Sequence, residues 1–426
     1  MEKWIPPVVI ALILVLIFWP PFILILVSLA LFYYLTLLYF NHRIPAPYLS
    51  VTTEADIVIN WFTKEAVYSA ICLKGYADAR LLLPESRVCN EITGNLAVNS
   101  AVIRNLPKNQ KFIYEIVQIP ANTIQNPDLI LNVASLKRLF SGKSYYFRTP
   151  TQDGLTNLDG EQKLTIIAFG DMQPKSKIPP LLQWWIMQKV ARQHPDLLFF
   201  LGDHTMEGID PLGWRQFYQI LGLVASHTPV LGVPGNHDTG LKRKGGLRKV
   251  HDSYLTYVNY PGEKSRYFVQ LNGIQIFAFD FESGFGLESP NYRLLQENIN
   301  KIHEDQWLIT LWHSSPHNSV KVGEDVLDLR RNFVPVLNVK GCRLWLGGHE
   351  HSYQRFKVED TYFLTSAATS SFHRHRANDE FLEKLIMQFH FLKLTLDPTK
   401  ILIEAISLTN QVLDTVQIEK TPKFAK

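Results

Sequence analysis

The sequence predicts an α/β fold preceded by an all-β segment and a hydrophobic amino terminus, and one observation supports each part. Residues 4–40 carry no charged side chain. Residues 51–150 contain short runs rich in β-branched and aromatic side chains, separated by turn residues, which is typical of a β-sandwich. After residue 160, continuous apolar runs alternate with helical patterns, which predicts βα units with helices on both faces of a sheet. We therefore expect three parts, at residues 1–43, 51–150 and 160–426.

The composition excludes several classes of protein. With 46% hydrophobic and 19% charged residues, the chain of 426 residues is expected to be globular rather than disordered. Its net charge of +4 is small and its basic residues form no single long run, so no nucleic acid partner is expected. Cys72, Cys89 and Cys342 form no Cys-x-x-Cys pattern, which argues against a thiolate zinc site and a disulfide framework. A single bridge between Cys72 and Cys89 stays open.

The amino-terminal apolar stretch is interpreted as a membrane anchor. Residues 22–40 are about as long as the roughly 20 residues that a spanning helix needs. Pro20 and Pro21 separate them from residues 8–19, which are too short to span alone. This shorter piece either extends the helix beyond a kink or folds back as a re-entrant segment. A cleaved signal peptide fits poorly because no small-x-small cleavage site follows, and a buried core helix is the other alternative.

Localisation at a membrane is therefore expected, through a single-pass or re-entrant anchor. The side of the membrane stays open, because Lys3 is offset by Glu2 on one flank and only His42 and Arg43 follow on the other.

The segment that follows the anchor is predicted to be made of strands. Closely spaced prolines in residues 44–48 predict a short stiff linker. No catalytic constellation appears between residues 51 and 150, so a packing or substrate-framing role is expected for this part. Strands are predicted around residues 57–61, 66–73, 101–104, 111–117 and 145–149.

The region after residue 160 alternates between apolar runs and helical patterns. The hairpin signal Asn272-Gly273 joins two apolar runs, so the sheets are expected to be mixed. Strands are predicted at residues 164–170, 197–202, 230–233, 266–271, 274–280, 307–312 and 343–346, helices at 180–193, 212–226, 292–303 and 326–338, and further strands in the tail 384–418.

Nearly every strand of this region is followed by side chains that can bind a metal. Open α/β sheets place their sites at the carboxyl ends of their strands, so these side chains are expected to meet. Each taken alone has an ordinary explanation, such as a helix cap or a core histidine. Five groups on successive strand ends predict one shared site. The groups are Asp171 with Gln173, Asp203, Asn236 with His237 and Asp238, His313, and His349 with His351.

The residue types indicate a pair of divalent transition-metal ions. Two such ions roughly 3.5 to 4 Å apart need a carboxylate that bridges them. Imidazole, carboxylate and amide oxygen together suit iron, manganese or zinc, and no thiolate narrows the choice. A water held between two such ions loses its proton near neutral pH and becomes a nucleophile, while the ions neutralise charge on a phosphoryl group.

The order of these motifs resembles the calcineurin-like metallophosphoesterase superfamily. The motifs are Asp-x-Gln, Gly-Asp, Gly-Asn-His-Asp, His and Gly-His-x-His. The purple acid phosphatases look like the nearest branch, because the β-rich segment lies where their fibronectin-type domain does. Tyr-Val-Asn-Tyr-Pro at 257–261, His-Ser-Ser-Pro at 313–316 and the run 348–355 are further likenesses. The resemblance implies a fibronectin-like domain at 51–150 and a four-layer α/β/β/α metallophosphoesterase domain at 160–426.

The resemblance also implies roles for individual residues. The first metal ion is expected on Asp171, Asp203 and His351. Asp203 is expected to bridge to the second ion, which Asn236, His313 and His349 complete. His237 is expected to contact the phosphate and to protonate the leaving oxygen, with Asp238 as the second catalytic residue, and Asn236 and His317 are expected to help bind substrate.

Two positions depart from the pattern of the family. Many members have Asp-x-His as the first motif, whereas this chain has Gln173, whose amide oxygen is expected to be a weaker ligand. Purple acid phosphatases place a tyrosine three residues after the bridging aspartate, where this chain has Met206. Two divalent ions are therefore expected rather than a firmly held ferric ion.

The function expected from these residues is hydrolysis of a phosphate monoester by a hydroxide that bridges two metal ions. One alternative is a phosphodiesterase that acts on nucleotides or phospholipids. The other is a metal-bound interaction domain without catalysis, which Gln173 and Met206 prompt.

Overall fold

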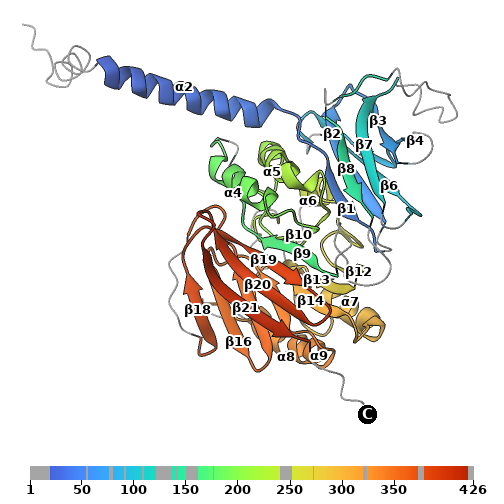
Figure 1. The fold of residues 1–426 in the computed structure, drawn as a ribbon, viewed down its shortest axis with the longest axis vertical. Coiled ribbons are helices and arrows are strands. Elements are labelled where there is room, and N and C mark those ends of the chain that lie inside the picture. The colour runs from blue at the N-terminus through green and yellow to red at the C-terminus, as the bar shows by residue number, and fades with distance from the viewer. Residues whose placement is uncertain are drawn as a thin grey trace, which may run out of the picture.

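The protein folds into four β-sheets, with helices packed around the two larger ones (Figure 1). The two smaller sheets have four strands each, and the two larger ones have six and seven strands. The computed structural model describes residues 20–53, 56–75, 80–90, 93–107, 110–120, 136–139, 143–149, 162–175, 177–239, 252–271, 273–319, 324–372 and 379–420.

The described residues between 48 and 148 form the two four-stranded sheets, and every strand pair in them is antiparallel. Alternating residues point inward, so Trp61, Phe112 and Tyr114 are buried together. All five strands expected here are present, and three short ones were not expected. The first sheet contains β1 (Tyr48–Val51), β2 (Ile57–Lys64), β6 (Leu96–Ile103) and β5 (Ser86–Val88); the second contains β4 (Arg80–Leu82), β3 (Ser69–Lys74), β7 (Lys111–Gln118) and β8 (Tyr145–Arg148).

The six-stranded sheet carries the first three predicted strand ends. Its strands β9, β10 and β11 are parallel, and the last three strands of the chain extend it in antiparallel fashion. Helices α4 (Leu181–Ala191) and α5 (Pro211–Ala225) connect the parallel strands. The sheet order is β11 (Val230–Gly232), β10 (Leu197–Phe200), β9 (Leu164–Phe169), β19 (His390–Leu396), β20 (Lys400–Ser407) and β21 (Val412–Glu419).

The seven-stranded sheet carries the remaining strand ends. Its four central strands are parallel, and the strands at its borders are antiparallel. The order is β12 (Tyr267–Leu271), β13 (Ile274–Ala278), β14 (Trp307–Leu311), β15 (Leu344–Gly347), β17 (Thr361–Ser366), β16 (Tyr353–Val358) and β18 (Leu382–Ile386). The helices of this half are α6 (Asp252–Tyr257), η3 (Phe281–Ser283), α7 (Pro290–Asn298), η4 (Ile299–Lys301), α8 (Glu324–Asn332) and α9 (Val334–Val339).

These two sheets form a mixed α/β sandwich. One apolar cluster joins residues of both sheets with α4 and α5, and a second fills the space between the seven-stranded sheet and α7 to α9. Strands β9, β14 and β15 are buried along their whole length, which explains why they appear in the sequence as continuous apolar runs.

Two features of the α/β sandwich also differ from the sequence prediction. The helix expected at 326–338 is divided into α8 and α9 at Phe333, and Pro335 stands in the first turn of α9, where a missing N–H is tolerated. The antiparallel pair β16 and β17 was not expected, because no turn dipeptide of glycine or proline separates the two strands.

The helix α2 (Pro20–His42) extends from the body of the protein (Figure 1). Residues 24–42 are long and apolar enough to cross a membrane, and 6% of the most apolar window is buried. A signal sequence or a core helix passes the same test, so length and composition alone are weak evidence for a span. The predicted segment at 8–19 lies outside the described residues.

The all-β segment packs directly on the α/β sandwich. The buried Tyr114 hydroxyl of β7 donates a 2.7 Å hydrogen bond to the carbonyl of Ser226 at the end of α5. The Tyr48 hydroxyl donates a 2.6 Å bond to the carbonyl of Tyr257, and Leu49 forms an isolated bridge with Pro229. These contacts hold the loop before β11 against the all-β segment.

Removing the Tyr114 hydroxyl tests this contact. We expect Tyr114→Phe to lower the free energy of unfolding by about 1 to 2 kcal/mol, because the buried Ser226 carbonyl loses its donor. Urea unfolding in detergent measures the loss, with Tyr146→Phe at a half-exposed position as the control. Equal midpoints for the two variants would contradict this account.

Candidate metal centre

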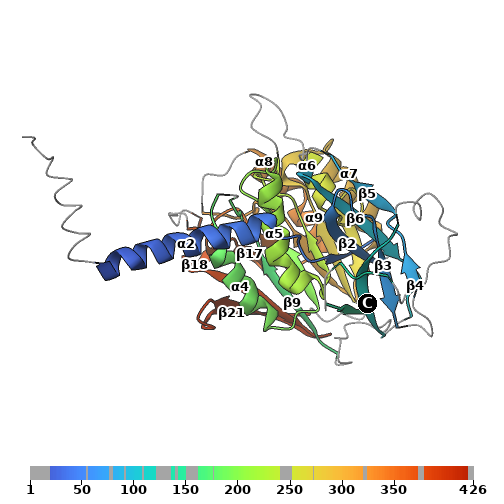
Figure 2. The same ribbon diagram turned by 90° about the horizontal axis from the view of Figure 1, so that it is seen from above.

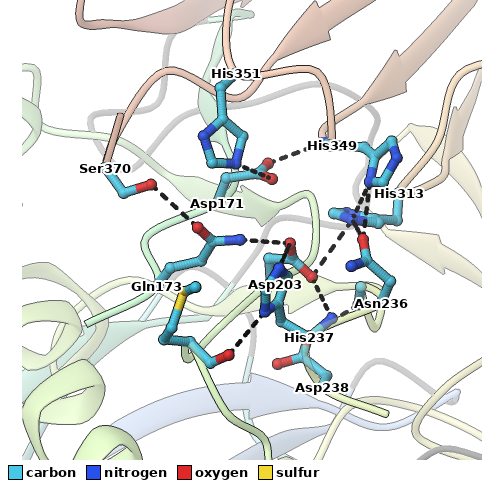
Figure 3. Close-up of polar contacts among 12 residues, drawn as sticks. Asp171, Gln173, Asp203, Asn236, His237, Asp238, His313, His349, His351 and Ser370 are labelled. Atoms are coloured by element: carbon cyan, nitrogen blue, oxygen red, sulfur yellow. Dashed lines mark hydrogen bonds and ion pairs between the residues drawn. The ribbon is translucent and has the colours of Figure 1, made fainter. Parts of the chain in front are cut away.

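The loops that follow β9, β10, β11, β14 and β15 converge at one edge of the sandwich (Figure 3). All seven side chains predicted as metal ligands lie in this place. They come from both sheets, so only the packing of one sheet on the other brings them together. They are Asp171, Gln173, Asp203, Asn236, His313, His349 and His351.

Two buried carboxylates form the centre of this cluster. Asp171 is fully buried and Asp203 is 1% exposed. Oδ2 of Asp171 accepts a 3.0 Å hydrogen bond from the backbone N–H of His349, whereas its Oδ1 accepts none from the described residues. Burial raises the pKa of Asp171, and repulsion from the Asp203 carboxylate raises this pKa further. A bound cation would compensate the charges of both carboxylates, and Oδ1 of Asp171 could bind it.

An imidazole faces each carboxylate. His351 Nε2 lies 3.3 Å from Asp171 Oδ1, and His313 Nε2 lies 3.4 Å from Asp203 Oδ1. The ligand atoms of Asp171, Asp203 and His313 lie within 4.8 Å of one another. Carboxylate and imidazole together suit iron, manganese and zinc, so the residues fit the ions that the sequence predicts.

Hydrogen-bond partners outside the cluster set which nitrogen of each histidine faces it. His313 Nδ1 lies 2.8 Å from the carbonyl of Leu201, so this nitrogen carries the proton and Nε2 presents a lone pair. His351 Nδ1 lies 2.7 Å from the hydroxyl of Ser371, which leaves its Nε2 toward Asp171. Both histidines are therefore oriented as metal ligands usually are.

Asn236, His313 and His349 form a second group of donors. Asn236 Oδ1 lies 3.0 Å from His313 Nε2 and 2.8 Å from His349 Nδ1. The two imidazole nitrogens are 3.2 Å apart. Three potential ligand atoms so close together again match a cation site.

The backbone at the cluster adopts conformations that most side chains avoid. Asp171, Gln173, Asp203 and His349 have φ angles of +60°, +43°, +57° and +70°. Left-handed φ in residues other than glycine is uncommon and concentrates at functional sites, where neighbouring structure holds it. These four residues are among the strand-end residues that the sequence singles out.

Gly235 allows the closest approach in the site. A Cβ atom at this position would overlap Asp203 Oδ1 and the Asp203 backbone nitrogen. The turn after β11 can therefore lie against the Asp203 carboxylate only because residue 235 has no side chain.

Gln173 points into the cluster in place of the histidine common in the family. Its Nε2 donates a 2.7 Å hydrogen bond to Asp203 Oδ2, and its Oε1 accepts a 3.3 Å bond from the Ser370 hydroxyl. A rotation about the last side-chain bond exchanges the two amide atoms, so the same position can present oxygen to a cation.

His237 lies at the rim of the cluster with its ring partly exposed. Its Nδ1 is 2.7 Å from the backbone carbonyl of Met206, which places the proton on Nδ1 and leaves Nε2 free for another partner. Nε2 is 4.0 Å from Asp203 Oδ2. The Met206 backbone, not its side chain, is thus what orients this histidine.

Asp238 lies behind the cluster, where it is fully buried. Its carboxylate accepts hydrogen bonds from the backbone N–H groups of His204 and Gly235, at 3.0 and 2.8 Å, and lies 2.8 Å from His204 Nδ1. His204 Nε2 is 3.1 Å from the Tyr260 hydroxyl. Asp238 and His204 therefore hold two of the strand-end loops together from beneath.

His317 was expected to touch substrate, but the structure places it apart from the other site residues. It is buried among Phe356, Phe363 and Phe381, and its Nδ1 lies 3.3 Å from Asp379 Oδ2. Burial lowers its pKa to about 4. This arrangement resembles that of a core histidine.

A pocket of about 410 Å³ opens over the cluster. Its wall includes Asp203, His237 and the loop from Gln173 to Pro180. Ser370 and Ser371 also line it, and sequence reasoning did not identify them. The only local signal is the small-residue run that follows β17, which is weak because such runs are common in loops.

The comparisons with known proteins agree with this geometry. The family model for calcineurin-like phosphoesterases matches residues 164–353, which contain every predicted ligand. This part of the chain therefore matches the calcineurin-like phosphoesterase domain that its motifs resemble. The match supports a phosphoester hydrolase of a family that uses divalent metals. No curated protein sequence matches the chain.

Solved structures show the same fold. A purple acid phosphatase, PPD1 from yellow lupin (Lupinus luteus) seeds, superposes with a TM-score of 0.72 at 16% identity, over 88% of this chain and 74% of that one. PhoD superposes with a TM-score of 0.57 at 11% identity, over 89% of this chain and 90% of that one. At these identities the likeness concerns the fold alone.

Gly235→Ala tests whether the cluster binds metal through the observed geometry. We expect the added methyl group to displace Asp203 and to weaken metal binding about tenfold or more, because Asp203 lies between both donor groups. Metal per protein after dialysis, measured by elemental analysis, reports the loss.

Gly286→Ala is the matched control, since no heavy atom lies within 4 Å of its added Cβ. Unchanged metal content in Gly235→Ala would mean that the cluster is not the binding site.

Proposed function

We propose that this protein is a membrane-tethered phosphohydrolase that cleaves phosphate monoesters with two divalent ions. The proposed parts are an anchor at 1–43, a fibronectin-like domain at 51–150 and a four-layer α/β/β/α catalytic domain at 160–426. The observation that carries the proposal is the buried pair Asp171 and Asp203, with an imidazole 3.3 or 3.4 Å from each.

The first ion is assigned to Asp171, Asp203, His351 and, through its amide oxygen, Gln173. Asp203 is the proposed bridge, since its two oxygens face different donor groups: Oδ1 lies near His313 and Oδ2 near Gln173. The second ion is assigned to the group of Asn236, His313 and His349. The orphan Oδ1 of Asp171 supports the first assignment.

When bound, the ions would supply a deprotonated water as nucleophile and neutralise charge on the phosphoryl group. His237 is assigned to the leaving group. Its Nε2 faces the pocket while the Met206 carbonyl holds Nδ1, so a protonated Nε2 can donate to a phosphate oxygen or a departing oxygen. Asn236 shares this side of the pocket and can donate its amide hydrogens to the substrate.

Asp238 is assigned a positioning role. Its carboxylate is engaged by the backbone of His204 and Gly235 and has no exposed surface, so it acts on the reaction through the turn that carries His237. We assign no contact with substrate to His317.

A monoester is favoured because the fold is similar to that of a purple acid phosphatase, with a TM-score of 0.72, and the order of the motifs in this chain resembles that branch. The absence of a tyrosine at Met206 favours two divalent ions over a ferric ion.

Replacing His237 tests the assignment. We expect His237→Ala in the full chain to lower kcat on p-nitrophenyl phosphate by about 10² to 10⁴ with metal content unchanged, because general acid catalysis is lost. His303→Ala, at an exposed position, is the control and should keep its activity.

The same assay uses bis(p-nitrophenyl) phosphate and added manganese, iron or zinc. A faster diester reaction would make the protein a phosphodiesterase. If neither ester is hydrolysed with any of these metals while the metal is bound, the enzyme proposal fails and a non-catalytic metal-bound domain takes its place.

A further inference from the structure

Helix α4 has apolar side chains on both of its faces. Ile186, Met187 and Val190 are buried in the main core. On the other side Leu181, Trp184 and Trp185 are exposed, at 41%, 40% and 45%. A helix that is apolar all round is usually enclosed by protein or by lipid, so the exposed side of α4 needs a partner.

The neighbour of this face is the apolar helix α2. Figures 1 and 2, seen from directions 90° apart, both show the carboxyl-terminal half of α2 beside α4 and α5. The Tyr33 hydroxyl donates a 2.8 Å hydrogen bond to the carbonyl of Lys177, in the loop before α4. The exposed face of α4 therefore adjoins the helix that is the candidate membrane span.

The end of α2 is fixed to the body of the protein. Phe40 is buried, and Asn41 accepts hydrogen bonds from Arg215 and Gln216 of α5, at 2.5 and 2.7 Å. Tyr33 lies nine residues before His42, so roughly 14 Å of helix runs along the protein before α2 leaves it. A bilayer that surrounds the exposed residues 24–35 would consequently reach the level of α4.

The side chains on this face are those that occupy the surface of a bilayer. Tryptophan and tyrosine concentrate at the level of the headgroups, and lysine stems extend from apolar depth toward phosphate. Lys175 and Lys177 are exposed in the loop before α4, and Lys189 Nζ lies 6.0 Å from the ring centroid of Trp185. Their charge complements anionic lipid headgroups.

The candidate metal pocket opens beside the same face. Ile178 is 50% exposed and also lines the pocket. Lys175, Pro179 and Gln183 line it too, so the loop before α4 and the first turn of α4 form one wall of the pocket. A phosphate group at headgroup level would lie next to this opening.

We propose that Ile178, Leu181, Trp184 and Trp185 form a bilayer-contacting face that presents the metal pocket to phosphate esters of membrane lipids. The membrane contact stands on the geometry of α2 and α4. The substrate class rests on the proposed phosphohydrolase function.

The double variant W184Q/W185Q in the full chain, reconstituted in vesicles of phosphatidylcholine and phosphatidylglycerol, tests both parts. Brominated phosphatidylcholine should quench tryptophan fluorescence less in the variant than in the wild type. Hydrolysis of phosphatidic acid in the vesicles should fall about tenfold, while hydrolysis of soluble p-nitrophenyl phosphate should stay within about twofold.

Two further variants serve as controls. W184F/W185F keeps the face apolar and should restore hydrolysis of phosphatidic acid. L287Q/V339Q removes two exposed apolar side chains on the side of α7 and α9 and should behave as the wild type. If L287Q/V339Q loses as much hydrolysis of phosphatidic acid as W184Q/W185Q does, the proposal is overturned.

The outcomes separate this proposal from the proposed function. Equal quenching in the wild type and W184Q/W185Q would overturn the bilayer contact. If the only change in W184Q/W185Q is its oligomer size in detergent, the bilayer contact is likewise overturned and the face is assigned to a second copy of the chain. Activity of the wild type on p-nitrophenyl phosphate but not on phosphatidic acid would overturn the lipid substrate alone. Inactivity on both of these monoesters would refute the phosphate monoesterase, while the quenching result still decides the membrane contact.

Discussion

The burial of two neighbouring carboxylates is the constraint on which the site depends. Asp171 and Asp203 are both buried, and burial together with the neighbouring Asp203 carboxylate raises the pKa of Asp171. Burying charged carboxylates costs free energy unless cations or hydrogen-bond donors surround them. The imidazoles of His313 and His351, the left-handed backbone at the strand ends and the bare Gly235 are all arranged about this pair.

A supporting layer beneath the cluster keeps the arrangement in place. Asp238 links the loops after β10 and β11 through His204 and Gly235, and His204 reaches Tyr260 near the start of the seven-stranded sheet. The all-β segment adds to this support, because Tyr114 and Tyr48 bond to the carbonyls of Ser226 and Tyr257. The all-β segment thus contributes to the packing of the part of the chain that carries the donor cluster.

The amino terminus and the site are connected in space although they are far apart in sequence. The end of α2 is bonded to α5, and Tyr33 reaches the loop that continues into the pocket wall. These contacts fix the orientation of α2 relative to the pocket. A helix joined to the sandwich only through a flexible linker would have no fixed orientation relative to the pocket.

Local patterns in the sequence determined most of the elements and the identity of the donor cluster. Buried strands appear as continuous apolar runs, and the groups after them, such as Asp171 and His349, need no tertiary information to be recognised as ligand types. Only the tertiary structure decided the partners: Ser370 and Ser371 line the pocket, His317 packs among phenylalanines, and an exposed face of α4 adjoins both α2 and the pocket. The reason is physical. Periodicity and turn chemistry act over a few residues, whereas these contacts depend on how two sheets and a helix pack across separations of a hundred residues or more.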